Sequence, residues 1–202
     1  MSTPTRTSET GSSRCEWASA APELLAYHDA EWGFPTALDQ RLFEKLCLES
    51  FQSGLSWRTI LNKRESFRAA FCGFHHEKIA EFTDDDVARL LGDAAIVRNR
   101  AKIEAVINNA RRASELVADH GSLAAFIWSF EPDPADLGPP QTVTTAPAST
   151  AMAQELKRLG WRFLGPTTAF AFMQSMGLIN DHLSDCIIRP AAEAARAAFV
   201  RP

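Results

Sequence analysis

The chain has few of the features that mark a membrane or secreted protein. No segment carries the ~20 uninterrupted apolar residues that a membrane-spanning helix requires. The polar segment of residues 1–14 lacks the apolar run of a signal peptide, so we expect it to be a disordered leader. Together these absences predict a cytoplasmic protein with no membrane partner.

The chain also has few cysteines and no excess of basic charge. Four cysteines in a chain kept in a reducing compartment are not expected to form a disulfide framework, which leaves metal binding, catalysis or packing as their uses. The net charge is −4, so the overall composition does not mark a nucleic-acid-binding protein. Phosphate contacts need only a local basic surface, however, so the distribution of charge matters more than its sum.

Hydrophobic residues are abundant and their spacing is helical. They make up 46% of the chain, enough to bury a core. Apolar residues recur three and four positions apart and strand signals are few, so we expect an all-α fold. Asp39 can cap a helix that ends at Gly54, and Ser56 can cap a second helix that runs to about Phe71.

Further helix signals continue along the chain. Thr83 and Asp86 resemble a capping box, and a long amphipathic helix follows over residues 100–120. Residues 131–147 hold five prolines and are expected to form a loop. The other expected helices begin at Ser122 or cover Ser149–Leu159, Thr167–Met176 and Pro190–Ala198.

Basic residues gather in one segment. Between Arg98 and Arg112 there are five basic residues and one acidic residue, Glu104. Such a run is typical of a solvated helix face. It also fits a phosphate-binding helix entry, in which Arg98, Arg100 and Lys102 would contact DNA together with backbone amides.

Two pairs of cysteine and histidine lie near opposite ends of the chain. Cys15 and His28 form the first pair, and His182 and Cys186 form the second at the i, i+4 spacing that puts two side chains on one face of a helical turn. Two thiolates and two imidazoles make a closed tetrahedral zinc set, which is typical of a structural site. The alternative is that each residue is buried separately in the core.

Glu49 lies on the same helical face as Leu42 and Leu46, so it is expected to face inward. A carboxylate in that position is paired, neutralised or held for a ligand. Trp17, Tyr27, Trp32 and Trp57 lie close in sequence to Glu49 or to the first Cys/His pair, and are either core residues or walls of a pocket. Aromatic walls around a carboxylate suit a flat cationic ligand.

Five strings of the sequence carry a resemblance to a known family. The chain resembles the bacterial 3-methyladenine DNA glycosylase I family of the helix-hairpin-helix DNA glycosylase superfamily. The matching strings are "YHDAEWG" (27–33), "LFEKLCLESFQSGLSW" (42–57), "LNKRESFRAAF" (61–71), "IVRNRAKIEAVINNA" (96–110) and "GLINDHLSDC" (177–186). They follow one another in the order typical of the family.

The resemblance implies a two-lobed helical fold in which a structural zinc ion ties the terminal segments together. It divides the chain into the leader (1–14), a glycosylase domain of two helical lobes (15–190) and a C-terminal helix or tail (191–202). The zinc ligands that it implies are Cys15, His28, His182 and Cys186. The resemblance therefore favours one shared metal site over four separately buried residues.

The resemblance also implies an activity and a site. The family hydrolyses the N-glycosidic bond of 3-methyladenine flipped out of duplex DNA, without lyase activity. Glu49 is the candidate catalytic residue, in the role of base recognition and electrostatic partner; with Tyr27 it would hydrogen-bond the base, while Trp57 stacks on it and Trp17 lines the pocket. We expect a monomer acting on double-stranded DNA that contains alkylated adenine.

Two positions depart from the family pattern, and a second function stays open. Leu24 stands where an aromatic residue is frequent, and Ala95 stands where glycine is common. The alternative function is a non-enzymatic, zinc-stapled module that recognises alkylated or distorted DNA. A helical protein–protein adaptor, suggested only by the proline-rich loop, is a third hypothesis.

Overall fold

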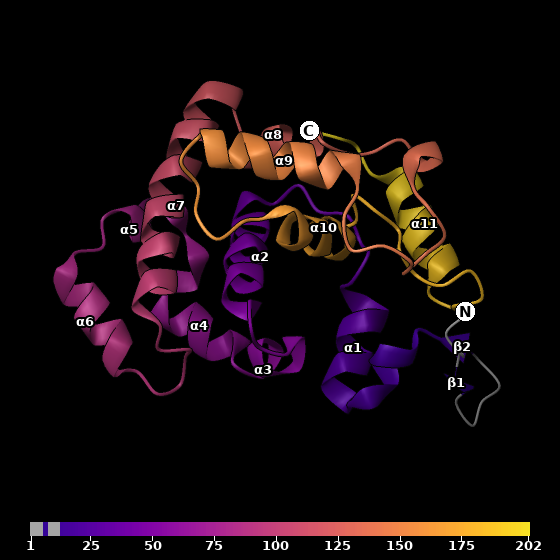
Figure 1. Ribbon diagram of the computed structural model, residues 1–202, viewed down its shortest axis with the longest axis horizontal. Helices are drawn as coiled ribbons and strands as arrows, with labels where there is room; N and C mark the ends of the chain where they lie inside the picture. Colours follow the sequence, from indigo (N-terminus) through magenta and orange to yellow (C-terminus); the bar gives the residue numbers. More distant parts are fainter. Residues whose placement is uncertain (1–5, 8–12) are drawn as a thin grey trace.

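The computed structural model describes residues 6–7 and 13–202 of the chain. It consists almost entirely of helices (Figure 1), which confirms the prediction of a mostly helical fold. The α-helices are α1 (Pro22–Ala30), α2 (Asp39–Gln52), α3 (Trp57–Asn62), α4 (Arg64–Ala70), α5 (His76–Ala80), α6 (Asp84–Gly92), α7 (Arg100–His120), α8 (Leu123–Trp128), α9 (Pro147–Arg158), α10 (Pro166–Ser175) and α11 (Arg189–Ala198). Short 3-10 helices lie at Glu16–Ala20, Cys72–Phe74 and Pro134–Asp136.

The expected leader, residues 1–14, lies mostly outside the described residues. Within it, β1 (Arg6–Thr7) pairs antiparallel with β2 (Ser13–Arg14). In the part of the chain that the structure describes, no helix has the length and apolar character needed to cross a membrane.

Side-chain caps start several helices where the sequence predicts them. The hydroxyls of Ser56 and Ser122 accept hydrogen bonds from backbone N–H groups three residues further on, at 3.2 and 2.9 Å. The Asp86 carboxylate accepts a hydrogen bond from the backbone N–H of Thr83 at 3.1 Å, as a capping box requires. The long helix α7 has the bounds that the periodicity predicts.

Asp39 has a different role from the predicted one. Leu38 is the N-cap residue of α2, and Asp39 is the first residue inside the helix. Its carboxylate accepts hydrogen bonds from the backbone N–H groups of Leu123 and Ala124, at 3.0 and 2.8 Å. Asp39 therefore caps α8, because the first N–H groups of that helix have no partner within it.

The helix predicted from Ser56 to about Phe71 is two helices, α3 and α4. The backbone leaves the helical conformation at Lys63, between them. The Lys63 ammonium donates hydrogen bonds to the carbonyls of Ala94 and Ala95, at 3.3 and 2.9 Å. The junction of α3 and α4 is thereby fixed to the turn that leads into α7.

A cluster of phenylalanines forms the centre of the core beside α2. Phe43, Phe51, Phe67, Phe71 and Phe74 have no exposed surface. The rings of Phe51 and Phe67 lie 4.6 Å apart between centroids, and aromatic pairs at this spacing add to the free energy gained by burial. Since α7, α8 and α10 also pack on α2, the helix that carries Glu49 is held from several sides.

Segments from both halves of the chain meet beside α1. Gly177 follows α10 with a φ of +77°, and a Cβ added there would lie 2.5 Å from the backbone N of Pro35, so only glycine fits. The backbone N–H of Gly33 donates to the Ser175 carbonyl at 3.3 Å. In Figure 1, α1 and the C-terminal helix α11 accordingly lie toward the same end of the molecule.

Candidate functional site

A cavity of about 510 Å³ opens among the N-terminal segment, α2 and α3. Trp17, Tyr27, Glu49 and Trp57, the four residues implied for base binding, all line it. They lie, in order, in the 3-10 helix Glu16–Ala20, in α1, near the end of α2 and at the start of α3. The structure therefore brings all four predicted residues to one cavity, whose size is usual for a small-molecule site.

The aromatic residues of the cavity contact one another. The ring centroids of Tyr27 and Trp57 are 5.3 Å apart, and those of Trp17 and Tyr27 are 6.4 Å apart. Trp32 packs edge-on against Trp17 at 5.1 Å. These contacts fix the ring planes, so a flat ligand can stack without a large loss of side-chain entropy.

Glu49 is buried at the inner side of the cavity, with 6% of its surface exposed. Its carboxylate lies 2.7 Å from the ammonium of Lys45, which is one helical turn earlier on α2 and equally buried. The same ammonium donates to the Tyr27 hydroxyl at 2.8 Å and lies 3.3 Å from the centroid of the Trp57 ring. Lys45 therefore contacts three of the four predicted base-binding residues.

Burial and charge shift the titration of this group of residues. Burial lowers the pKa of Lys45, and the neighbouring Glu49 carboxylate opposes that shift. Burial also raises the pKa of Tyr27, and the negative charges of Glu49 and Glu31 raise it further. The tyrosine therefore stays a neutral phenol at physiological pH, and it can both accept a hydrogen bond from Lys45 and donate one.

Lys45 is the functional residue that our sequence interpretation missed. The sequence predicted that Glu49 could be paired, but the lysine at i−4 was not among the predicted site residues. The spacing itself was a readable signal, because side chains four residues apart on a helix are neighbours. What the sequence did not show is that this helical face is fully enclosed.

The four predicted metal ligands meet in one buried cluster of Cys15, His28, His182 and Cys186, whose ligand atoms all lie within 4.8 Å of one another. His182 Nδ1 is 3.1 Å from His28 Nε2, 3.6 Å from Cys186 Sγ and 3.8 Å from Cys15 Sγ. Tetrahedral zinc with ordinary bond lengths has N···N edges of about 3.3 Å and N···S edges of about 3.6 Å. The donors thus fit a four-coordinate metal site of the zinc type.

Outer hydrogen bonds point one nitrogen of each histidine into the cluster. His28 Nδ1 lies 2.7 Å from the Asp29 carboxylate, and His182 Nε2 lies 3.0 Å from the Trp32 carbonyl. Each partner accepts a hydrogen bond from the imidazole N–H, so His28 Nε2 and His182 Nδ1 can direct their lone pairs toward the centre of the cluster. Such outer partners are usual around metal-binding histidines.

Each thiol of the cluster, Cys15 and Cys186, shifts the pKa of the other. Their mutual hydrogen bond raises the pKa of Cys15, and the same bond with those from both imidazoles lowers the pKa of Cys186. Without a cation the pair therefore favours a single thiolate. A divalent metal would allow both sulfurs to ionise, which is the form that binds it.

His182 and Cys186 reach the cluster by a route different from the predicted one. They lie in the turns between α10 and α11 and not in a helix, and the Cys186 N–H donates to the Leu183 carbonyl at 2.9 Å. Tight turns bring both side chains to the same point. The predicted convergence is observed, but its helical explanation was wrong.

The three residues predicted to contact DNA divide into two groups. Arg98 and Arg100 are exposed at the start of α7. Lys102 is buried, and its ammonium donates to the carbonyls of Phe51 and Ser53 at 2.9 and 2.6 Å. The prediction for Lys102 is corrected: its charge stabilises the end of α2, where helix carbonyls lack partners.

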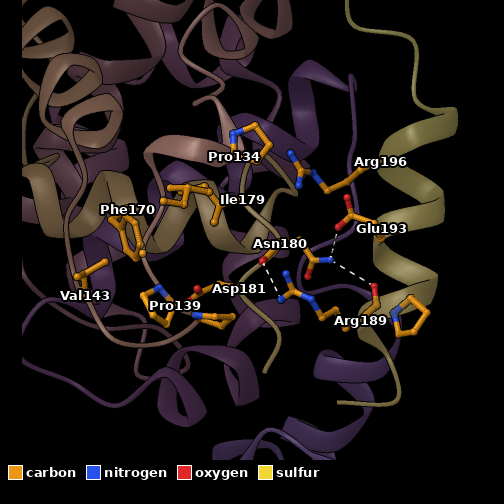
Figure 2. A pocket seen from close by; sticks show the side chains of 14 residues that line it. Pro134, Pro139, Val143, Phe170, Ile179, Asn180, Asp181, Arg189, Glu193 and Arg196 are labelled. Carbon is orange, nitrogen blue, oxygen red and sulfur yellow. Dashed lines mark hydrogen bonds between the residues drawn. The ribbon is translucent and has the colours of Figure 1, made fainter. Parts of the chain in front are cut away.

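A second cavity, of about 390 Å³, lies between the proline-rich loop and α11 (Figure 2). Its polar side chains bond largely to the protein itself: the Asn180 amide donates to Glu193 at 2.9 Å, and Arg196 pairs with Glu131 at 2.8 Å. None of the predicted base-binding or metal-binding residues lines it. We therefore take the cavity with Glu49 as the candidate site.

The sequence is similar to proteins of known activity along most of its length. A match to the family described as methyladenine glycosylase covers residues 17–189. DNA-3-methyladenine glycosylase 1 of Escherichia coli (strain K12) is 42% identical over 88% of this chain and 97% of that protein. The DNA-3-methyladenine glycosylase of Haemophilus influenzae is 44% identical over 86% of this chain and 96% of its own length.

The fold is similar as well. A structure of 3-methyladenine DNA glycosylase I from Staphylococcus aureus, which concerns recognition of 3-methyladenine, superposes with a TM-score of 0.82 at 38% identity, covering 87% of this chain and 96% of that one. The family match contains every residue that lines the cavity and three residues of the metal cluster, His28, His182 and Cys186, while Cys15 lies two residues before it. The chain belongs to the methyladenine glycosylase family.

Proposed function

We propose that this protein is a DNA-3-methyladenine glycosylase, a monofunctional base-excision repair enzyme that hydrolyses the N-glycosidic bond of 3-methyladenine flipped out of duplex DNA. The observation that carries the proposal is the cavity that gathers Trp17, Tyr27, Glu49 and Trp57 in a chain of this family. One chain supplies every residue of this cavity and of the metal cluster, which supports action as a monomer.

The chemistry of the lesion explains why the cavity needs little catalytic machinery. Methylation at N3 gives the base a positive charge and weakens the C1′–N9 bond. When this bond breaks, its electron pair goes to N9, the base leaves neutral and the positive charge passes to the sugar. Water then bonds to C1′ and loses a proton. No acid is required to protonate the leaving base.

The pocket residues would recognise the base by shape and by hydrogen bonds. The Glu49 carboxylate can accept a hydrogen bond from the amino group of adenine, and the Tyr27 hydroxyl can contribute a second. Trp57 would stack against a face of the ring, and Trp17 would line the pocket. A base that leaves a buried polar group without a partner would bind more weakly, which gives selectivity.

We propose zinc as the metal of the Cys15, His28, His182 and Cys186 cluster, with a structural role. The support is the donor set of two sulfurs and two nitrogens at distances that suit a tetrahedron. Four protein ligands leave no position for an activated water. Bound zinc would therefore hold the N-terminal segment to the turn before α11, and the pocket residues would carry out the reaction without it.

The absence of lyase activity is also part of the proposal. A lyase needs a free amine that can attack the sugar. The lysine beside the pocket, Lys45, is engaged by Glu49 and Tyr27. We therefore expect an abasic site with an intact strand as the product.

Release of the base from methylated DNA is the direct test. Purified protein incubated with methylated duplex DNA should release 3-methyladenine, detected by chromatography, and should leave strands that break only after heating in alkali. If the protein binds methylated DNA tightly yet releases no base while a control glycosylase does, the non-enzymatic DNA-binding function replaces the proposed one.

Variants of the basic segment should separate DNA contact from stability. We propose that Arg98 and Arg100 contact phosphates. Arg98→Ala should therefore weaken binding of any duplex, and the slope of log K against log[salt] should become less steep by about 1, the contribution of one phosphate contact. Lys102→Met should instead lower the free energy of unfolding by about 1–3 kcal/mol, because two carbonyls lose a buried charged donor. Salt titrations of DNA binding and chemical denaturation measure the two effects. An Arg98→Ala variant with unchanged salt dependence would remove Arg98 from the interface.

A further inference from the structure

Lys45 is a charged residue beside the pocket for which the proposed reaction has no evident use. Its ammonium is buried against the Glu49 carboxylate, the Tyr27 hydroxyl and the face of Trp57. It does not itself line the open cavity, so it contacts these residues from behind the wall. A buried cation beside the expected site of a cationic base should repel that base, so its presence needs a physical explanation.

The ion-pair pattern behind the pocket makes Lys45 the specific partner of Glu49. Glu31 pairs with Arg64 at 2.6 Å and with Arg41 at 3.1 Å. Within residues 13–202, Lys45 is the only residue that forms a salt bridge with Glu49. The pair therefore makes the inner wall of the pocket neutral overall, where Glu49 alone would make it negative.

The reaction itself explains why a neutral wall is useful. The positive charge of the base moves to the sugar as the C1′–N9 bond breaks. An unpaired carboxylate beside the base would stabilise the bound substrate more than the transition state, and so would raise the barrier. A carboxylate that already has a cationic partner can accept a hydrogen bond from the base without holding its charge in place.

We propose that Lys45 is a positioning residue that acts through Glu49 and Trp57. It lowers the affinity of the pocket for the cationic lesion and makes the bond-breaking step faster. This inference rests on the proposed function. The Trp57 ring takes part, because an ammonium against its π-system offsets the attraction that the ring would otherwise have for a cationic base. Recognition then depends on stacking and hydrogen bonds more than on charge.

Single-turnover kinetics on methylated duplex DNA at neutral pH can test this. Lys45→Met keeps most of the side-chain volume and removes the charge. We expect its rate constant at saturating enzyme to fall about tenfold, and the half-saturating enzyme concentration to fall as well. A variant with only a packing defect would bind more weakly, not more tightly.

A double variant supplies the rescue. Lys45→Met with Glu49→Gln removes both charges and restores a neutral wall, so its rate constant should exceed that of Lys45→Met alone. In the Glu49→Gln background, adding Lys45→Met should also lower the half-saturating concentration, because an unpaired ammonium no longer repels the base. This second comparison does not require the single Lys45 variant to fold. Lys157→Met, on the exposed face of α9, is the matched control and should match wild type.

Two results would overturn the inference: equal kinetic constants with and without Lys45 in both backgrounds, or a loss of affinity in Lys45→Met that Glu49→Gln does not reverse. Wild-type protein is assayed in the same series. If it releases no base, the proposed function fails; if it is active but Lys45 has neither effect, only the role of Lys45 fails.

Discussion

If the cluster holds the proposed zinc ion, Cys186→Ser should release it and lower the melting temperature of the protein by roughly 6–12 °C. Loss of one ligand opens the site and leaves buried sulfur and nitrogen donors without a partner. Buried polar groups without partners cost about 1–3 kcal/mol each, so a total near 3 kcal/mol is a conservative expectation. In a chain of this length, 1 kcal/mol corresponds to about 2–4 °C. Metal analysis and thermal denaturation measure the two effects.

Cys72→Ser is the matched control for this prediction. Cys72 is exposed and lies outside the cluster, so its replacement should leave zinc content unchanged. A strong chelator should bring the wild type close to the Cys186 variant and have little effect on the variant itself. Wild-type protein that holds well under half an equivalent of zinc after careful preparation would count against the four-ligand site.

Glu49→Ala should lower kcat/KM on methylated DNA at least about 100-fold, which corresponds to ~2.7 kcal/mol. The base loses a charged hydrogen-bond acceptor, and the remaining Lys45 ammonium repels the cationic lesion. The same variant should lose about 3–5 kcal/mol of stability, because Lys45 is left buried without its ion pair. Kinetics, denaturation and titration with free 3-methyladenine give three separate measurements.

Glu44→Ala distinguishes the role in recognition from the role in stability. Glu44 lies on the same helix, is also buried and pairs with Arg68 at 2.7 Å, but it does not line the base cavity. It should lower stability and leave the affinity for free 3-methyladenine near the wild-type value. If Glu49→Ala binds the free base as well as Glu44→Ala does, Glu49 is not a recognition residue.

The local parts of the fold could be predicted from the sequence because their causes are local. Ser56 and Ser122 cap the helices that follow them, and α7 has its expected bounds, since capping side chains and apolar periodicity act over a few residues. Asp39 looked like another cap of this kind. It caps α8, more than eighty residues away in sequence, and only tertiary packing decides that choice.

In the candidate site too, features with local causes could be predicted and features set by tertiary packing could not. The sequence and its family resemblance predicted the residues that meet in the cavity and in the metal cluster. The predicted phosphate contact of Lys102 was wrong because its burial depends on how α7 packs against the end of α2. Lys45 was missed because a lysine next to aromatic residues is usually solvated, and enclosure by three neighbours cannot be read from one helix.

Tyr27 and His28 are consecutive residues of α1, and their side chains serve the base cavity and the metal cluster respectively. One short helix is thus a shared boundary of two binding sites. If zinc holds α1 in the conformation that binds the base, it raises base affinity, and thermodynamic reciprocity then requires the base to raise zinc affinity by the same factor. The metal would therefore influence lesion binding while remaining outside the reaction.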